Sequence, residues 1–95
     1  MLNIKRSGKF NHILELLTEN DEELESLVEE TIILFQKNPQ DTRFSDHALR
    51  KRMKGKRAFS ITGEIRIIYR QISRNVVRFL DIGTHPQVYS RKKKS

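Results

Sequence analysis

Three runs between residues 56 and 82 decide the fold: KRAFSIT at 56–62, EIRIIYRQI at 64–72 and VVRFLDI at 76–82. Each run is short and rich in β-branched and aromatic residues, which is typical of strands. Gly63 separates the first two runs, and Ser-Arg-Asn at 73–75 separates the last two. Because short polar turns of this kind join antiparallel neighbours, we expect a three-stranded antiparallel meander.

The residues before the meander predict a strand followed by two helices. Residues 2–6 alternate apolar and polar side chains, as a short strand does. Ser7 can cap the first helix, and Asn20 with Glu23 has the spacing of a capping box for the second. Pro39 ends the second helix, because proline cannot continue the hydrogen-bond ladder. Helical spacing predicts these buried positions: Phe10, Ile13, Leu14, Leu17, Leu24, Leu27, Val28, Thr31, Ile32 and Phe35.

Together these elements predict a single α+β domain over residues 1–90: an N-terminal strand, an antiparallel two-helix hairpin and the meander, forming one sheet with the helices on one face. Residues 40–55 are expected to be irregular, and the basic residues 91–95 to form a tail that attracts phosphates. There is no cysteine, and the longest apolar run covers only residues 32–35. We therefore expect a cytoplasmic protein without disulfides or a membrane span.

Charge divides the chain into two unequal parts. Residues 1–40 hold 4 Lys or Arg against 8 Asp or Glu, a balance of −4. Residues 41–95 hold 15 against 4, a balance of +11. A basic half of this strength indicates a polyanionic partner, and we favour nucleic acid over a surface tuned only for solubility. The sheet face opposite the helices is where such a partner would bind.

The middle strand offers a pair of side chains for chemistry. Alternation predicts a core set and an open-face set: Ile65, Ile67 and Tyr69 in the core, and Glu64, Arg66, Ile68 and Arg70 on the open face. Glu64 and Arg66 are therefore neighbours on the open face. They form either an ordinary surface salt bridge or a carboxylate for proton transfer beside a guanidinium that binds phosphate.

Two of the three histidines lie where chemistry is expected. His47 precedes a basic run at 50–57, and His85 follows the last strand, whereas His12 falls on the polar side of the first helix and is expected at the surface. Their spacing matches no metal motif, so we expect neither a metal nor a cofactor. Phe79 and Tyr89 can each either stack on a base or pack against apolar neighbours.

Four further segments follow one another in order: SDHAL at 45–49, KGKRAFSI at 54–61, EIRIIY at 64–69 and DIGTHPQVY at 81–89. This ordered set resembles the RelE/YafQ toxins of bacterial toxin–antitoxin pairs. The resemblance implies a compact sheet with helices on one side and ribosome-dependent cleavage of messenger RNA. It also implies a cognate antitoxin that holds the activity in check and through which alone oligomers form.

The resemblance carries roles onto individual residues. The histidines and the acidic residue of the YafQ-like branch fall on His47, Glu64 and His85. Its strand arginine falls on Arg66, and its C-terminal aromatic falls on Tyr89. These five residues are the catalytic candidates.

The basic residues of the same segments are the candidates for RNA binding. The lysine-rich RelE arrangement is partly met by Lys54 and Lys56, and Arg57 and Arg70 add to the positive charge. Ser60 stands where the YafQ-like branch can place another histidine. For that reason the sequence leaves open which residue is the general base and which is the general acid.

RNA carries its own nucleophile, the 2′-hydroxyl, so the expected reaction needs no metal. His85 and either His47 or Glu64 would share the proton transfers, while Arg66 with a nearby lysine would stabilise the phosphate charge. Two alternatives stay open. One is a ParE-like toxin that inhibits DNA gyrase without nuclease activity, and the other is a non-catalytic RNA-binding module.

Overall fold

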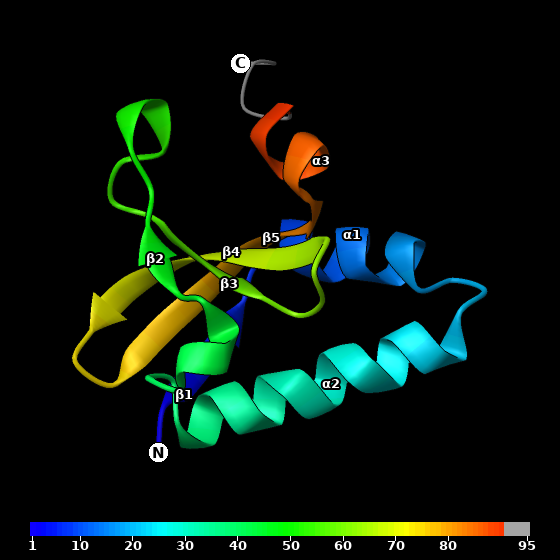
Figure 1. Cartoon of the computed structure of the whole chain (residues 1–95), viewed down its shortest axis with the longest axis horizontal. Coiled ribbons are helices and arrows are strands. Elements are labelled where there is room, and N and C mark those ends of the chain that lie inside the picture. Colours follow the sequence, from blue (N-terminus) through cyan, green and yellow to red (C-terminus); the bar gives the residue numbers. More distant parts are fainter. Residues whose placement is uncertain (91–95) are drawn as a thin grey trace.

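The structure is a computed structural model that describes residues 1–90, so the basic tail expected at 91–95 lies outside the described residues. Figure 1 labels the elements in chain order. They are β1 (Asn3–Arg6), α1 (Gly8–Leu17), α2 (Glu22–Lys37), the 3₁₀ turn η1 (Thr42–Phe44), β2 (His47–Ala48), the 3₁₀ turn η2 (Lys51–Met53), β3 (Arg57–Ser60), β4 (Ile65–Ser73), β5 (Val76–Thr84) and α3 (His85–Ser90). Among these residues, no helix has the length and apolar character that crossing a bilayer requires.

The five strands form one mixed sheet in the order β1-β5-β4-β3-β2. The antiparallel meander of β3, β4 and β5 is confirmed. β1 joins the far edge by pairing in parallel with β5, and β2 adds the opposite edge by pairing with β3. β2 has only two residues and lies in the stretch expected to be irregular, so that expectation was wrong here. A strand this short carries no readable alternation of apolar and polar residues.

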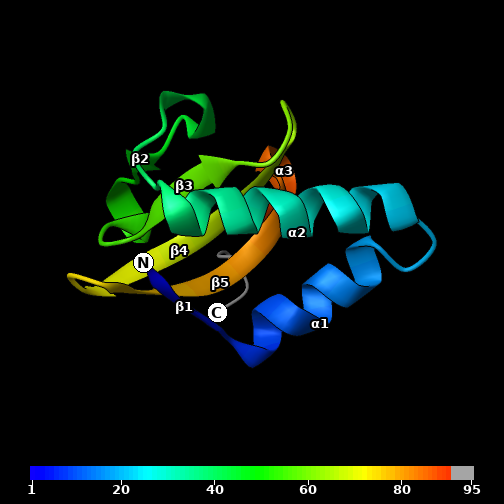
Figure 2. The ribbon, with the colours of Figure 1, turned by 90° about the horizontal axis from the view of Figure 1, so that it is seen from below.

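The two long helices form the expected hairpin, and they converge at the turn between them (Figures 1 and 2). The Ser7 hydroxyl accepts a hydrogen bond from the Phe10 N–H at 3.0 Å, which confirms the first cap. The second cap was misplaced by one residue. Asp21, not Asn20, accepts from the Leu24 N–H at 3.0 Å, because the turn after Leu17 needs one more residue before α2 begins.

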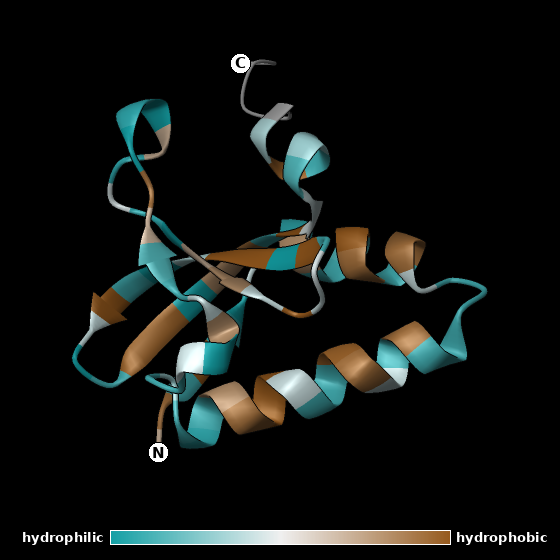
Figure 3. Cartoon of the chain, in the orientation of Figure 1, coloured by the Kyte–Doolittle hydropathy of each residue, from teal (hydrophilic) through white to brown (hydrophobic). Residues whose placement is uncertain are grey.

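Phe35 of α2 lies at the centre of the main core. Its ring stacks on Phe59 of β3 with centroids 3.9 Å apart, and it meets Tyr69 of β4 edge-on at 5.4 Å. Figure 3 shows the hydrophobic residues that α2, β4 and β5 contribute in alternation with hydrophilic ones. Leu27 was wrongly expected in this core. Its neighbour Val28 is fully buried there, whereas Leu27 is 39% exposed. The expected core side chains Ile67 and Tyr69 are fully buried, and Ile65 packs against them.

The sheet face that α1 and α2 cover is called the hairpin face below, and the opposite face is called the α3 face. The two long helices cover one face as expected, and two short elements that the sequence analysis did not predict, α3 and η2, stand on the other (Figure 1). Ile68, expected on the open surface, is 1% exposed there. It belongs to a second, smaller apolar cluster, whose buried members are Met53, Ala58, Ile68 and Val88.

Candidate functional site

The α3 face carries most of the residues that the sequence analysis singled out. Cross-strand partners in a sheet project from the same face. Two rows of partners cross this face: His47, Ala58, Ile68 and Asp81 in the first, and Ser60, Arg66 and Gly83 in the second. The sheet therefore holds His47 and Arg66 on one surface, although they come from different strands.

Arg66 combines burial with an unmet hydrogen-bond donor. Its side chain is half-buried on β4, between Ser60 and Gly83 of the neighbouring strands. Among residues 1–90, the buried Nε–H of Arg66 has no hydrogen-bond partner. A buried donor without an acceptor costs about 1–3 kcal/mol, and such groups are rare unless a ligand satisfies them. A guanidinium binds phosphate strongly through paired N–H groups, so this site suits a phosphate.

α3 begins with a capping box that the sequence analysis did not use. The Thr84 N–H donates to Gln87 Oε1 at 2.8 Å, and the Gln87 N–H donates to Thr84 Oγ1 at 3.4 Å. Pro86 fits the first helical turn, because an N–H at that position would have no partner inside the helix. Thr-His-Pro-Gln at 84–87 is therefore the signal that could have predicted a helix here.

α3 also sets two predicted site residues against each other. The rings of His85 and Tyr89 lie one helical turn apart, with centroids 4.3 Å apart and planes at 61°. Tyr89 is half-buried against the second apolar cluster, whereas His85 is exposed at the start of the helix. The edge-on contact restrains the imidazole without removing it from solvent, which leaves it able to exchange protons with a bound substrate.

His47 is exposed on β2 and its ring is held by a local hydrogen bond. Nδ1 lies 2.9 Å from the backbone carbonyl oxygen of Ser45. A carbonyl only accepts, so Nδ1 must donate and Nε2 of the neutral ring is left as a proton acceptor. Ser45 itself has a left-handed backbone conformation, with a φ of 51°. Nε2 of His47 is thus left as an exposed hydrogen-bond acceptor in the neutral ring.

Glu64 lies in the turn before β4 rather than in the strand itself. Its backbone N–H donates to Thr62 Oγ1 at 3.0 Å, and its side chain is exposed. Within the described chain no ion pair joins Glu64 to Arg66, so the ordinary salt bridge considered above is not formed. The carboxylate is free to act on a substrate that reaches this end of the face.

The basic candidates fall into two groups. Lys56 and Arg70 line a depression of about 340 Å³ on the α3 face, together with Lys9 of α1 and the buried carboxylate of Asp81. Lys54 is exposed at the end of η2 and directly follows Met53, which lines the depression. Apolar atoms of Met53 and other second-cluster residues form its wall. Such a depression suits a nucleotide, whose base is apolar and whose phosphate is anionic.

Arg57 is not brought to this group. It pairs with Tyr69 across β3 and β4, which places it on the hairpin face. Its Nε donates to Asp46 Oδ1 at 3.0 Å, forming an ion pair with that carboxylate. Lys56 immediately precedes β3 and lines the depression, whereas Arg57, the first residue of the strand, does not.

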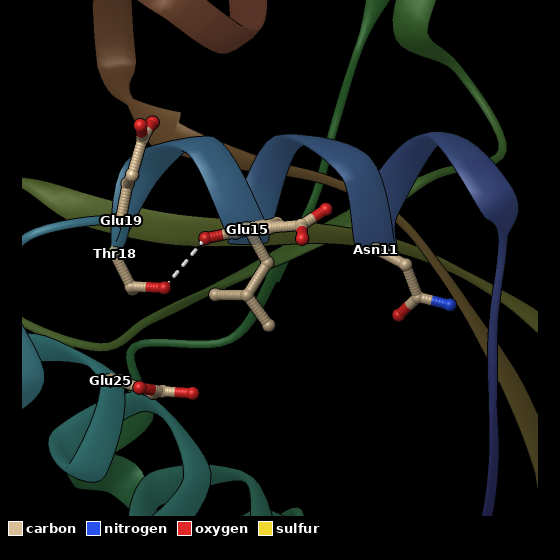
Figure 4. A pocket seen from close by; sticks show the side chains of 6 residues that line it. Asn11, Glu15, Thr18, Glu19 and Glu25 are labelled. Atoms are coloured by element: carbon tan, nitrogen blue, oxygen red, sulfur yellow. Dashed lines mark hydrogen bonds between the residues drawn. The ribbon is translucent and has the colours of Figure 1, made fainter.

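A second cleft, of about 390 Å³, lies between α1 and α2 and has the opposite charge. Figure 4 shows the carboxylates of Glu15, Glu19 and Glu25 around it. Thr18 closes one side, with its hydroxyl donating to the Leu14 carbonyl oxygen at 2.9 Å. An acidic cleft repels phosphate, so this cleft is not a candidate for binding a polyanion.

Comparison with known proteins identifies the family of the chain. The fold, and the match of a family model described as the bacterial toxin of type II toxin–antitoxin system, YafQ, define a toxin of such a system. The chain belongs to the YafQ family, whose model matches residues 2–90. A comparison with curated proteins finds no match.

Three solved structures, of two related toxins, share the fold. YafQ from E. coli is 22% identical with a TM-score of 0.76, covering 94% of this chain and 99% of that one. YafQ in the E. coli DinJ–YafQ complex is 23% identical with a TM-score of 0.70, and the match covers 94% of this chain and 99% of that one. A metal-bound toxin from Helicobacter pylori is 25% identical with a TM-score of 0.70, and the match covers 93% of this chain and 99% of that one.

Proposed function

We propose that this toxin is an endoribonuclease that cleaves messenger RNA on the ribosome, without a metal or cofactor, in the cytoplasm. The observation that carries the proposal is the buried, unpartnered Nε–H of Arg66. Arg66 lies on the same face as His47, and its cross-strand partner Gly83 is two residues before His85, which contacts Tyr89. Phosphate is the ligand that this donor and the surrounding positive charge fit best.

In the proposed reaction, the 2′-oxygen of the RNA attacks the adjacent phosphorus while the bond to the 5′-oxygen breaks. Nε2 of His47 accepts the proton of the 2′-hydroxyl, and His85 gives a proton to the leaving 5′-oxygen. Glu64 is the alternative acceptor at the end of the same face. Each proton transfer contributes typically about 10²–10⁴-fold in rate, and histidine suits the task because its pKa lies near neutral pH.

Arg66 would stabilise the charge that develops on the phosphate oxygens, assisted by Lys54 or Lys56. Tyr89 would stack against a base and orient the nucleotide, with Arg70 holding a neighbouring phosphate. The products would be a 2′,3′-cyclic phosphate on the upstream fragment and a 5′-hydroxyl on the downstream fragment.

We further propose that a cognate antitoxin protein binds the basic α3 face and blocks it, and that higher oligomers form only through it. Support comes from the structurally similar E. coli YafQ, which is solved in complex with DinJ. An acidic antitoxin segment would complement the +11 balance of residues 41–95. The two chains should co-purify in equal numbers or a multiple of that ratio.

The test adds purified toxin to translating ribosomes and maps the cut sites and end groups of the messenger RNA. Cleavage should survive EDTA at a concentration that leaves ribosomes intact, and it should fail when the cut position carries 2′-deoxy or 2′-methoxy. A parallel reaction with gyrase and supercoiled DNA tests the ParE-like alternative. A 3′-hydroxyl product, or gyrase inhibition without RNA cleavage, would overturn the proposal.

A further inference from the structure

Asp46 and His47 are neighbours in the chain but serve opposite faces of the sheet. His47 pairs with Ala58 and faces the α3 side. The carboxylate of Asp46 turns to the hairpin side, where it accepts from Arg57 Nε at 3.0 Å and from the Tyr69 hydroxyl at 2.5 Å. Asp46 therefore links the edge of the candidate site to the two central strands β3 and β4.

Tyr69, one of the two partners that hold the Asp46 carboxylate, is fixed by burial. Tyr69 is 2% exposed and its ring packs edge-on against Phe35 and Phe59. Burial, and then the hydrogen bond to Asp46, raise the pKa of the Tyr69 hydroxyl above its usual range, so it remains a donor. The Asp46 side chain is itself only 16% exposed.

Apart from the Asp46 side chain, few contacts hold the segment that carries His47. Ser45, His47 and Ala48 are exposed, and β2 pairs with β3 over only two residues. The ring of His47 bonds to the Ser45 carbonyl, and Asp46 is the residue between them. A shift of Asp46 would therefore move both the imidazole and the carbonyl that selects its tautomer.

We infer that Asp46, clamped by Tyr69 and Arg57, is a positioning residue that orients the His47 imidazole for proton transfer. The inference rests on the proposed ribonuclease function, since it assigns to His47 a proton-accepting task. It also gives Arg57 a role other than RNA binding. A displacement of about 1 Å in a catalytic group can cost on the order of 10²-fold in rate.

The test uses Asp46→Asn and Tyr69→Phe, which keep the size of each side chain, in the messenger RNA cleavage assay. We expect kcat to fall on the order of 10-fold or more for Asp46→Asn, and less for Tyr69→Phe, with KM changed by less than about twofold because Arg66 and the depression are untouched. Asp41→Asn is the matched control. It removes a carboxylate of the same loop that bonds only to its neighbour Arg43, and it should leave kcat unchanged.

A double-mutant cycle with His47→Ala separates positioning from a general loss of structure. If Asp46 acts through His47, Asp46→Asn should have no further effect on kcat in the His47→Ala protein. Additive losses would overturn the inference. So would a KM increase of the same size as the kcat loss.

Nitrogen-15 NMR of the histidine side chains gives a readout that needs no activity. In the unaltered protein, the hydrogen of His47 should reside on Nδ1. In Asp46→Asn, the ring should show a mixture of tautomers or faster exchange. If the unaltered protein cleaves no RNA, the ribonuclease proposal fails and this measurement still decides whether Asp46 orients His47; an identical His47 spectrum in both proteins would overturn the inference.

Discussion

Two arginines, one on each face of the same sheet, show how differently the two sides are built. Arg57 on the hairpin face gives its Nε–H to Asp46. The Nε–H of Arg66 on the α3 face is buried and has no partner among residues 1–90. On the hairpin side, polar groups are paired and rings are packed, as stability requires. On the α3 side the Arg66 Nε–H lacks an acceptor, at a cost of about 1–3 kcal/mol that a bound anion would offset.

Charge follows the same division. The cleft between α1 and α2 is lined by glutamates. The depression on the α3 face is lined by Lys9, Lys56 and Arg70 and by the buried Asp81, whose Oδ2 lies 3.9 Å from Lys9 Nζ. The larger apolar cluster lies on the hairpin face, and the residues proposed to contact RNA lie on the α3 face. Changes on the two faces should therefore separate stability from activity.

The largest expected effect is on the hairpin face. Phe35→Ala removes a ring that is fully buried and stacked on Phe59 at 3.9 Å. The lost burial and the remaining cavity should reduce the free energy of unfolding by about 3–5 kcal/mol, measured by urea denaturation. A loss below about 1 kcal/mol would mean that this side does not hold the fold as described.

The next effect is on activity. Arg66→Ala and His85→Ala should each lower the cleavage rate on the order of 10²-fold or more, through lost charge stabilisation and lost proton transfer. Arg66→Lys should recover only part, because an ammonium keeps the charge but loses the planar fork. Stability should not fall with Arg66→Ala, since the variant also removes a buried donor without a partner. An unfolded or fully active Arg66→Ala protein would contradict the division between the faces.

The sequence predicted the hairpin face better than the α3 face. Alternation along β4 correctly placed Ile67 and Tyr69 in the core, because a face covered by long helices needs an unbroken apolar row. It failed for Ile68, whose burial depends on α3. α3 has six residues, too few for a helical period to be visible, and only its capping box marks it.

Arg57 and Asp46 teach a related lesson about the site. Arg57 was grouped with Lys54 and Lys56 because the three belong to one basic run, but the register of β3 with β4 turns Arg57 to the other face. Its partner Asp46 lies 11 positions earlier in the chain, and no local pattern connects the two. Pairing between distant residues is decided by the tertiary fold. Sequence reasoning therefore found the basic run but not that Arg57 and Lys56 serve different faces of the sheet.

A smaller effect should appear in the salt dependence of RNA affinity. Lys54→Ala and Arg70→Ala each remove one positive charge from the α3 face. If each contacts a phosphate of single-stranded RNA, the slope of log affinity against log salt should weaken by roughly 0.7 per variant. Lys37→Ala, at the exposed end of α2, is the matched control and should leave the slope unchanged. Equal slopes for all three variants would show that RNA does not distinguish the faces.

A further effect concerns alkaline pH. The pKa of Tyr69 is raised above its ordinary value of 10.0, first by burial and then by the bond to Asp46. A group with a raised pKa in the folded state gives its full stabilisation below the unfolded pKa and loses it as the pH rises beyond. The unfolding free energy should therefore decline above pH 10 more steeply in the unaltered protein than in Tyr69→Phe. Parallel curves in urea denaturation at pH 8 to 11 would show that the hydroxyl is not buried as described.

The smallest effect belongs to the acidic cleft between the helices. Glu15 and Glu19 lie on the α1 side of this cleft, four residues apart, and Glu25 of α2 lies on the other side (Figure 4); all three side chains are exposed. Glu15→Gln should raise the free energy of unfolding by only about 0.2–0.5 kcal/mol, the size of the repulsion between like charges one helical turn apart. Cleavage and RNA affinity should not change, because salt screens exposed charges over about 8 Å at physiological ionic strength and the sheet lies between the two clefts.

His12→Ala is the control for this last change, because His12 is exposed on the same helix and carries no carboxylate. It should alter stability by no more than a few tenths of a kcal/mol, as isolated surface changes do. High salt should abolish the gain from Glu15→Gln, since the gain is electrostatic. If Glu15→Gln instead changes the cleavage rate several-fold while His12→Ala does not, then the acidic hairpin takes part in substrate or ribosome binding. The separation of a structural face from an active one would then be wrong.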